Sequence, residues 1–259
     1  MWEKQLAAAI KAGELAKRKI IEVYKTNFTV ETKSDKSPVT KADKESDRII
    51  RDFLKKRFPT YAFLTEEGKD DKSRLKNDYV WIIDPLDGTS NFVAKNDEFT
   101  INIALSYKHK IVVGVVIIPM KNEIYYATSH GGAFYSINGT VREIHVNRKR
   151  ENLKVLLSRL HHGNAEEKII DKYGTRIIKK EYVGAAIKAC LVARGEAELV
   201  FGLNSKTKEW DTAAGQIIVK EADGVFLDPS SKTWMKYNRE DVANKNGYVI
   251  ANNRKNIII

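Results

Sequence analysis

The middle of the chain reads Trp81-Ile82-Ile83-Asp84-Pro85-Leu86-Asp87-Gly88-Thr89, and this stretch decides how the rest of the sequence is interpreted. The apolar run over residues 79–83 predicts a buried β-strand. Pro85 interrupts a regular strand ladder because it has no N–H to donate, and Gly88 allows the chain to turn sharply. We therefore expect a strand that ends in a tight turn.

Two carboxylates follow this strand directly, three residues apart. Because the chain turns there, Asp84 and Asp87 can leave the strand end on the same side, with the carbonyl of Leu86 between them. Carboxylate and carbonyl oxygens are the ligands that hard cations such as Mg²⁺ need. Residues 88–90 would then begin a helical turn whose free N–H groups suit a phosphate. The alternative interpretation is a simple turn whose acids cap a helix.

Helical periodicity dominates the N-terminal side of this segment. Residues 1 to about 24 read as an amphipathic helix. Thr40 lies three residues before Asp43, a spacing that predicts a capping box at the start of a second helix running to about Phe58. Between the two helices, residues 33–38 are expected to be a polar connector.

The middle and the C-terminal part of the chain differ in pattern. Tight connections between short β-rich runs predict an antiparallel meander, with strands at 61–64, 79–83, 100–107, 111–118, 123–129 and 132–136. Alternation after residue 150 predicts layered α/β structure, with strands at 155–158, 176–183, 198–201 and 248–251 and helices at 165–173, 186–193 and 211–222. We predict two subdomains that share a cleft, an α+β unit over residues 1–150 and an α/β unit over residues 151–259.

Three more acidic groups can be interpreted in two ways. Glu66, followed by Glu67, comes directly after a strand-like run, and alone it would read as a solvated loop. Asp211 opens a helix whose first residues are small, and alone it would read as an N-cap. Asp43 lies in a first helical turn, where the helix dipole favours an acid. All four acidic blocks together are more specific, and we expect their carboxylates to converge on one cleft.

The composition limits the classes of function. With 259 residues and a hydrophobic fraction of 42%, the chain can bury a sizeable core, which excludes a disordered protein. A formal net charge of +11 suits anionic partners, namely phosphorylated metabolites, nucleic acid or an anionic membrane. The single Cys190 leaves no internal disulfide, and no run is long enough to span a bilayer. We expect a cytoplasmic protein with no membrane partner and no signal peptide.

The four acidic blocks, around Asp43, Glu66, Asp84 and Asp211, resemble the inositol monophosphatase superfamily in their order and separation. These are lithium-sensitive, magnesium-dependent phosphatases, and the resemblance extends to about Asn252. It implies an α+β fold, a layered αβαβα sandwich like that of inositol monophosphatase and fructose-1,6-bisphosphatase. In such a fold, a mostly antiparallel sheet and a second sheet are separated by helices.

The resemblance also implies roles for single residues. In that family two or three Mg²⁺ ions are bound by the residues that match Glu66, Asp84, Asp87, Asp211 and the carbonyl of Leu86. The residues that match Thr89 and Asp43, with Glu66 beside them, position and deprotonate the attacking water. Converging carboxylates raise one another's pKa values unless cations neutralise them, which agrees with this scheme.

We expect water to attack the phosphoryl group directly, with no covalent phosphoenzyme. Cys190 lies in an apolar helical pattern, and no histidine neighbours the acidic blocks. The residues expected to contact the substrate are Asp87, Gly88, Thr89, Ser90, Lys188 and Asp211.

Three local features look like the bacterial-type 3′(2′),5′-bisphosphate nucleotidases of this superfamily. They are the segment 96–105, the run Ser158-Arg159-Leu160-His161, and the helix 186–193 with the later block Lys208-Glu209-Trp210-Asp211. Lys188 would meet the non-scissile phosphate of the substrate as a point charge. The alternative is an exposed helix lysine.

The chain also departs from these nucleotidases. Ala185 and Ala186 stand where serines are usual, and the run 201–204 lacks an arginine that often follows that strand. The acid that inositol phosphatases usually place around Gly202 is missing as well. We therefore rank adenosine 3′,5′-bisphosphate first as the substrate, with inositol 1-phosphate or fructose 1,6-bisphosphate as the alternative.

A hypothesis of another class is a non-catalytic, basic nucleic-acid-binding protein. It explains the net charge, but it predicts basic residues clustered with aromatic ones. The acids at the strand ends would instead repel a polyanion, so we expect no nucleic-acid polymer as partner. A homodimer is a further expectation, because dimers are common in the superfamily.

Overall fold

The computed structural model describes residues 1–33, 38–160, 163–203 and 206–259. Parts of three sequence predictions lie outside these residues: the connector 34–37, His161 and Asn204. The helices are α1 Glu3–Tyr24, α2 Lys41–Arg57, α3 Thr89–Val93, α4 Asn164–Asp171, α5 Ile187–Ala193 and α6 Glu209–Glu221. Short 3₁₀ turns lie at Ser73–Lys76, Pro119–Lys121, Gly174–Arg176 and Arg254–Asn256.

The strands form three sheets. A hairpin consists of β1 Val30–Thr32 and β2 Pro38–Thr40. The seven-stranded sheet has the order β3 Ala62–Thr65, β4 Tyr79–Asp87, β5 Thr100–Tyr107, β6 Lys110–Ile118, β7 Glu123–Thr128, β8 Ala133–Ile137 and β9 Thr140–Glu143. The five-stranded sheet has the order β11 Ile177–Val183, β10 Leu153–Ser158, β12 Leu199–Gly202, β14 Tyr248–Ala251 and β13 Val225–Leu227.

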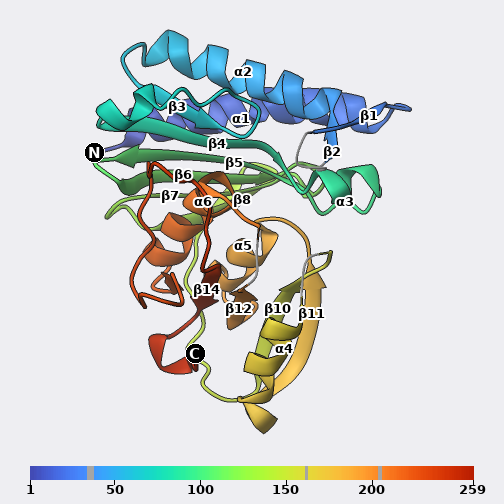
Figure 1. Ribbon diagram of the computed structural model, residues 1–259, viewed down its shortest axis with the longest axis vertical. Helices are drawn as coiled ribbons and strands as arrows, with labels where there is room; N and C mark the ends of the chain where they lie inside the picture. The colour runs from blue at the N-terminus through green and yellow to red at the C-terminus, as the bar shows by residue number, and fades with distance from the viewer. Residues whose placement is uncertain (34–37, 161–162, 204–205) are drawn as a thin grey trace.

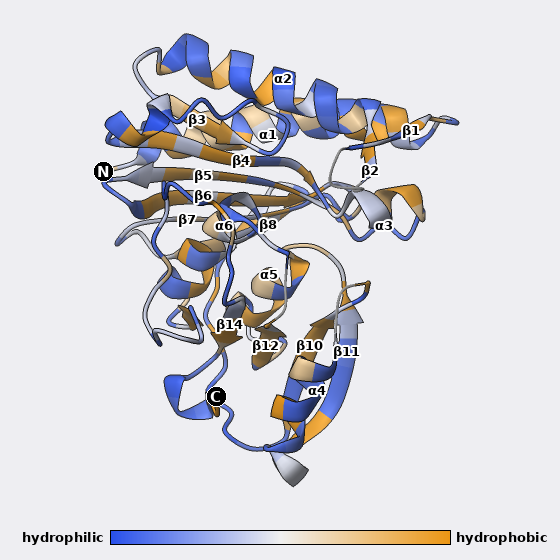
Figure 2. Cartoon of the chain, viewed as in Figure 1, coloured by the Kyte–Doolittle hydropathy of each residue, from blue (hydrophilic) through white to orange (hydrophobic). Residues whose placement is uncertain are grey.

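These elements stack in five layers, as the resemblance implied (Figure 1). Helices α1 and α2 cover the outer face of the large sheet, α5 and α6 lie between the two sheets, and α4 covers the outer face of the small one. Apolar residues concentrate in the central strands that these helices sandwich (Figure 2). Three clusters of buried side chains fill the interfaces between layers: one under α1 and α2, one around α5 and α6 that reaches both sheets, and one under α4. Burial from both sides thus holds the stack together.

The large sheet follows the predicted meander except at its first edge. Strands β4 to β9 pair antiparallel with their sequence neighbours. Strand β3 instead pairs parallel with β4, so the antiparallel prediction is wrong there. Because β3 and β4 run the same way, Glu66 after β3 and Asp84 near the end of β4 come to the same edge of the sheet. The parallel pairing therefore brings two acidic blocks together.

Helix α6 lies unusually close to the large sheet. A Cβ atom at Gly114 of β6 would come within 2.7 Å of the Ala214 carbonyl oxygen, so only glycine fits at this contact. The small residues that the sequence places at the start of α6 permit this approach. Helix α6 begins at Glu209, however, two residues before the predicted start. The division into subdomains 1–150 and 151–259 stays a prediction.

Candidate active site

A bulge at the end of β4 brings Asp84 and Asp87 together. On a regular strand, residues three apart point to opposite faces. Here Asp84 pairs with Asn102 and Asp87 pairs with Thr100, so three steps on β4 match two on β5. The strand thus continues through Pro85 with a break in register rather than ending before it. Both carboxylates consequently face the same side, as predicted.

Asp211 joins them from the start of α6. The three carboxylates of Asp84, Asp87 and Asp211 each place an oxygen within 4.8 Å of the others. Asp211 is the third residue of α6, and its Oδ2 accepts a bond of 2.5 Å from the Lys208 amide. It therefore makes one half of a capping box, the bond from the third helical residue back to the N-cap amide, because the Lys208 side chain has no acceptor for the other half. The alternative interpretation of Asp211 as an N-cap is therefore wrong, because Lys208 is the N-cap, whereas its predicted place in the cluster is confirmed.

This carboxylate cluster is under electrostatic stress. Burial, followed by the charges of Glu66, Asp87 and Asp211, raises the pKa of Asp84 well above its usual range. Burial and the charges of Asp87 and Glu66 raise the pKa of Asp211 to about 8. Burial also raises the pKa of Asp87, although Lys188 opposes the effect. An oxygen-only donor set of this kind fits a hard divalent cation, which would relieve the repulsion.

Glu66 approaches the cluster from the end of β3 and is held by a lysine. Its backbone N–H donates to the Ile83 carbonyl of β4 over 3.2 Å. Lys33 lies 2.8 Å from a Glu66 oxygen and also contacts Glu67. Although burial lowers the pKa of Lys33, the two carboxylates raise it above its usual range. The sequence analysis did not identify Lys33, because its partners lie more than thirty residues further along the chain.

Asp43 and Thr89 form a direct pair beside the cluster. The Thr89 hydroxyl donates to Asp43 Oδ1 over 2.8 Å and lies 3.3 Å from the Leu86 carbonyl oxygen. Asp43 Oδ2 accepts from the amide and the hydroxyl of Thr40, at 2.8 and 2.6 Å, in the predicted capping box. Burial raises the pKa of Asp43, whereas these hydrogen bonds oppose the rise. Ser46 of α2 also donates to the Pro85 carbonyl, which fixes α2 against β4.

Neutral groups from two other elements hold Asp87 in place. Its Oδ2 accepts from the Ala186 amide at 2.7 Å and the Asn102 amide group at 3.1 Å, and Thr100 lies at 3.3 Å. The sequence analysis gave Asn102 and Thr100 no such role. Their signal was present, since they are polar at alternate positions of an otherwise apolar strand. The sequence gave no signal for the Ala186 contact, because the backbone amide makes it and any residue type has such an amide except proline.

The turn after the strand is tightly packed. Gly88 has a φ of 90°, and a Cβ there would lie 3.1 Å from the Glu98 carbonyl oxygen. Helix α3 begins at Thr89 and has five residues, so the predicted helical turn at 88–90 is confirmed. Ser90 lies in its first turn and is half-buried.

Lys188 is not the exposed helix lysine of the alternative interpretation. Its exposed fraction is 6%, and its Nζ donates to the carbonyls of Ala185 and Val183 over 2.8 and 3.3 Å. Burial lowers its pKa, while the charge of Asp87 opposes this. Helix α5 thus places Lys188 inside the site, near the charge of Asp87. Its contact with a substrate phosphate stays a prediction.

A clamp beside the site joins the two sheets. Arg159, after β10, makes two bonds of 2.6 Å to the Glu98 carboxylate, which also accepts from the Gly184 amide. The structure thus gives Arg159 of the Ser-Arg-x-His run a structural partner. His161 of the same run lies outside the described residues.

Comparison with known proteins identifies the family. The model of the inositol monophosphatase family matches residues 1–258. The chain belongs to this family. It is therefore a phosphatase, a phosphoric monoester hydrolase, and the alternative of a non-catalytic nucleic-acid-binding protein finds no support among its relatives.

The relatives include both predicted substrate classes. The 3′(2′),5′-bisphosphate nucleotidase CysQ of Salmonella typhimurium is 35% identical over 249 residues, which cover 94% of this chain and 97% of the relative. The inositol monophosphatase of Mesembryanthemum crystallinum is 33% identical over 88% of this chain and 86% of its own. The CysQ structure from Bacteroides thetaiotaomicron matches with a TM-score of 0.84 and 30% identity, covering 98% of this chain and 99% of that one.

The relatives and the structure together confirm the inositol monophosphatase fold. Within the described residues, no helix is both long and apolar enough to cross a bilayer. The expected cytoplasmic location stays a prediction.

Proposed function

We propose that this phosphatase uses Mg²⁺ to remove the 3′-phosphate of adenosine 3′,5′-bisphosphate by direct attack of water. The observation that carries the metal requirement is the convergence of Asp84, Asp87 and Asp211 within 4.8 Å. Three buried or half-buried carboxylates at this distance repel one another, and a divalent cation between them supplies the missing charge.

The proposed ligands are Asp84, Asp87, Asp211, Glu66 and the carbonyl of Leu86, which would hold two or three ions. When bound, Mg²⁺ supplies a lowered pKa for a nearby water and neutralises charge on the phosphoryl oxygens and the leaving oxygen. Asp87 is pre-positioned for its role by the Ala186 amide and Asn102. Asp211 is pre-positioned by the Lys208 amide.

Asp43 and Thr89 would orient the nucleophile and take its proton. Because the Thr89 hydroxyl donates to Asp43, its oxygen lone pairs are free to accept a hydrogen bond from a water. A proton leaving that water can pass through the Thr89 hydroxyl to Asp43, whose pKa is raised by burial and which therefore accepts it more readily. Glu66, directly after β3, would complete the set of catalytic residues.

The substrate contacts are proposed from the same arrangement. The amides of Gly88, Thr89 and Ser90 would receive oxygens of the scissile phosphate, together with Asp87 and Asp211 through the bound cation. Lys188 would face the second phosphate. In the present conformation its Nζ is bonded to backbone carbonyls, so a substrate phosphate would have to replace those bonds.

Adenosine 3′,5′-bisphosphate ranks first because CysQ nucleotidases are similar to nearly the whole chain. Inositol 1-phosphate or fructose 1,6-bisphosphate is the second candidate, since inositol monophosphatases are similar at 33% identity. The test is kcat/KM for the three compounds with saturating Mg²⁺. A preference for either sugar phosphate above about tenfold, or about 1.4 kcal/mol, would overturn this ranking. Lithium inhibition and a homodimer stay predictions.

A further inference from the structure

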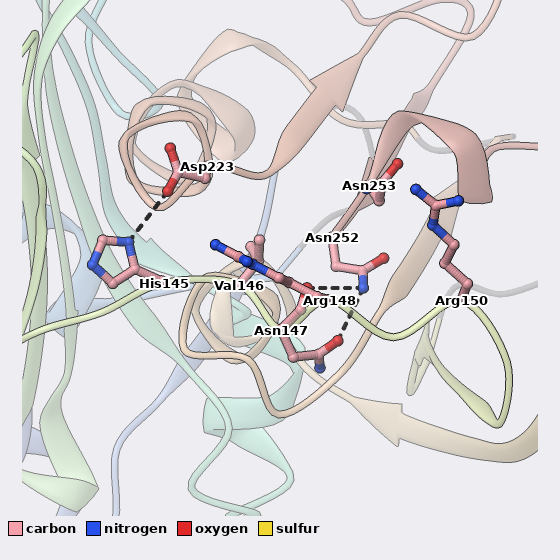
Figure 3. A pocket seen from close by; sticks show the side chains of 8 residues that line it. All are labelled: His145, Val146, Asn147, Arg148, Arg150, Asp223, Asn252 and Asn253. Carbon is pink, nitrogen blue, oxygen red and sulfur yellow. Dashed lines mark hydrogen bonds and ion pairs between the residues drawn. The ribbon is translucent and has the colours of Figure 1, made fainter.

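A polar cavity lies where the chain crosses from the large sheet to the small one. Its volume is about 500 Å³. The linker between β9 and β10 forms its floor, and the residues after α6 and β14 form its walls (Figure 3). It is lined by His145, Val146, Asn147, Arg148, Arg150, Asp223, Asn252 and Asn253.

This cavity is separate from the carboxylate cluster. Asp211 lies in the first turn of α6, whereas Asp223 follows the last turn of the same helix. At 1.5 Å per residue the two ends are about 18 Å apart. None of the lining residues belongs to the proposed catalytic set.

The floor of the cavity is firmly held. Asn252 has an exposed fraction of 3%, and its amide group donates to Asn147 Oδ1 and to the Lys149 carbonyl, both at 2.9 Å. Asn256, which is fully buried, donates to the same Lys149 carbonyl at 2.8 Å. Asn147 in turn donates to the Gly195 carbonyl at 2.8 Å. Buried amides thus fix the linker backbone, which lowers the entropy cost of binding there.

The linker presents two arginines to the cavity. Arg148 and Arg150 both line the cavity, whereas Lys149 does not. Lys149 lies 3.7 Å from the buried Glu198 carboxylate. Within the part of the chain that the structure describes, the guanidinium groups of Arg148 and Arg150 have no hydrogen-bond or ion-pair partner. Two of the three consecutive cations are therefore available to a ligand.

The wall opposite Arg150 carries Asp223, the one acidic residue among those that line the cavity. His145 and Asp223 lie 3.3 Å apart on that side, and Arg150 and Asn253 lie on the other (Figure 3). Asn253 uses its side-chain oxygen to cap the following turn, which leaves its amide nitrogen as a donor. Donors therefore dominate the wall around Arg150.

We propose that this cavity is a second binding site, for a small metabolite that carries a phosphate monoester. Its volume suits a ligand of nucleotide or sugar-phosphate size. A guanidinium fork matches two phosphate oxygens, so Arg150 and Asn253 on one side of the cavity would receive the phosphate, while Arg148, which extends toward His145, adds positive charge (Figure 3). Asp223 opposes the anion, so its charge weakens binding and limits how close the phosphate lies to that wall.

The test is an NMR titration of the full-length, Mg²⁺-loaded protein with inorganic phosphate as the probe. The amide signals of residues 146–150 and 252–253 report on this cavity, independently of those at the carboxylate cluster. We expect saturable shifts there, and an apparent Kd that rises about tenfold or more in Arg148→Ser/Arg150→Ser, because a charge-assisted contact and a second nearby positive charge are lost. Unchanged phosphatase activity of this variant shows that its fold is intact.

Two matched variants decide between a site and a general charge effect. Lys149→Ser/Lys255→Ser removes two positive charges nearby without touching the lining, and its Kd should stay within about twofold. Asp223→Asn should lower the Kd about two- to threefold, because it removes the opposing charge. Shifts that rise without saturation, an equal loss in the lysine pair, or weaker binding by Asp223→Asn would each overturn the proposal.

Discussion

Helices α2 and α6 begin with the same local geometry, but their capping acids face different surroundings. Asp43 is the third residue of α2 and Asp211 the third residue of α6. Each uses its Oδ2 to accept the backbone amide of the residue before the helix. Asp43 also accepts hydrogen bonds from the hydroxyl groups of Thr40 and Thr89, whereas Asp211 faces Asp84 and Asp87.

The difference shows how one local motif supports two kinds of chemistry. Around Asp43 neutral donors orient the carboxylate while burial raises its pKa, which suits a group that accepts a proton through Thr89. Around Asp211 the neighbours are negative, which suits a group that needs a cation. The capping geometry places both carboxylates with precision, and the second oxygen of each is left for function.

The strongest test of this contrast is Asp211→Asn. Asn keeps an oxygen for the Lys208 amide but cannot share a divalent cation with Asp84 and Asp87. We expect kcat/KM to fall about 10³-fold, or about 4 kcal/mol in transition-state stabilisation. Calorimetric titration with Mg²⁺ should show weakened binding. Full activity in this variant would rule out the proposed metal centre.

The corresponding change on the other helix is Asp43→Asn. It should lower kcat about 10²-fold, since the proton acceptor behind Thr89 is removed, while Mg²⁺ affinity changes by less than about twofold. As a control, Thr40→Ala weakens the same cap and removes one hydrogen bond to Asp43, but it keeps the carboxylate and its bond from Thr89. It should cost about 1 kcal/mol in the free energy of unfolding and leave most of the activity. A large loss of Mg²⁺ affinity in Asp43→Asn would contradict the division of roles.

A pH series without metal tests how the charge of Asp211 affects the stability of the fold. The pKa of Asp211 is about 8 in the folded protein and 3.8 in the reference state, so the folded state binds this proton more tightly. Its stabilising contribution is complete below pH 3.8 and is lost as the pH rises toward 8. In EDTA, the Tm at pH 8 should therefore lie at least about 3 °C below that at pH 6.

The control for the pH series is the metal-free Asp211→Asn protein, whose Tm should change less over the same range. Saturating Mg²⁺ should flatten the profile of the native sequence as well, because the cation then balances the charge. Parallel profiles for both proteins would show that the carboxylate cluster is not the source of the pH dependence.

The fold could be predicted wherever periodicity extended over many residues. Helices α1 and α2 and strands β5 and β14 lie where the sequence predicted them. Strands β1, β2, β9 and β13 were missed, since they have three or four residues, and β1 and β9 are exposed throughout. Such short segments carry no readable alternation. The parallel orientation of β3 depends on tertiary pairing, which local sequence does not encode.

The candidate site was predictable in its acids but not in its supports. The acids stand in recognisable blocks, and Asp84, Asp87 and Asp211 do converge as predicted. The bulge that aligns Asp84 with Asp87 depends on the register with β5. Lys33 and the Ala186 amide reach the site only through the folded chain. Contacts of this kind leave no local pattern to interpret.

The smallest expected effect concerns Lys33, which forms an ion pair with Glu66. Its ammonium group lies 2.8 Å from a Glu66 oxygen, so a cation that binds Glu66 must displace it. We expect Lys33→Met to lower the Mg²⁺ concentration for half-maximal activity about threefold, because the competing charge is gone. Lys44→Met is the matched control, since Lys44 pairs with the exposed Glu31. If Lys33→Met instead requires more Mg²⁺, the lysine orients Glu66 for the metal rather than competing with it.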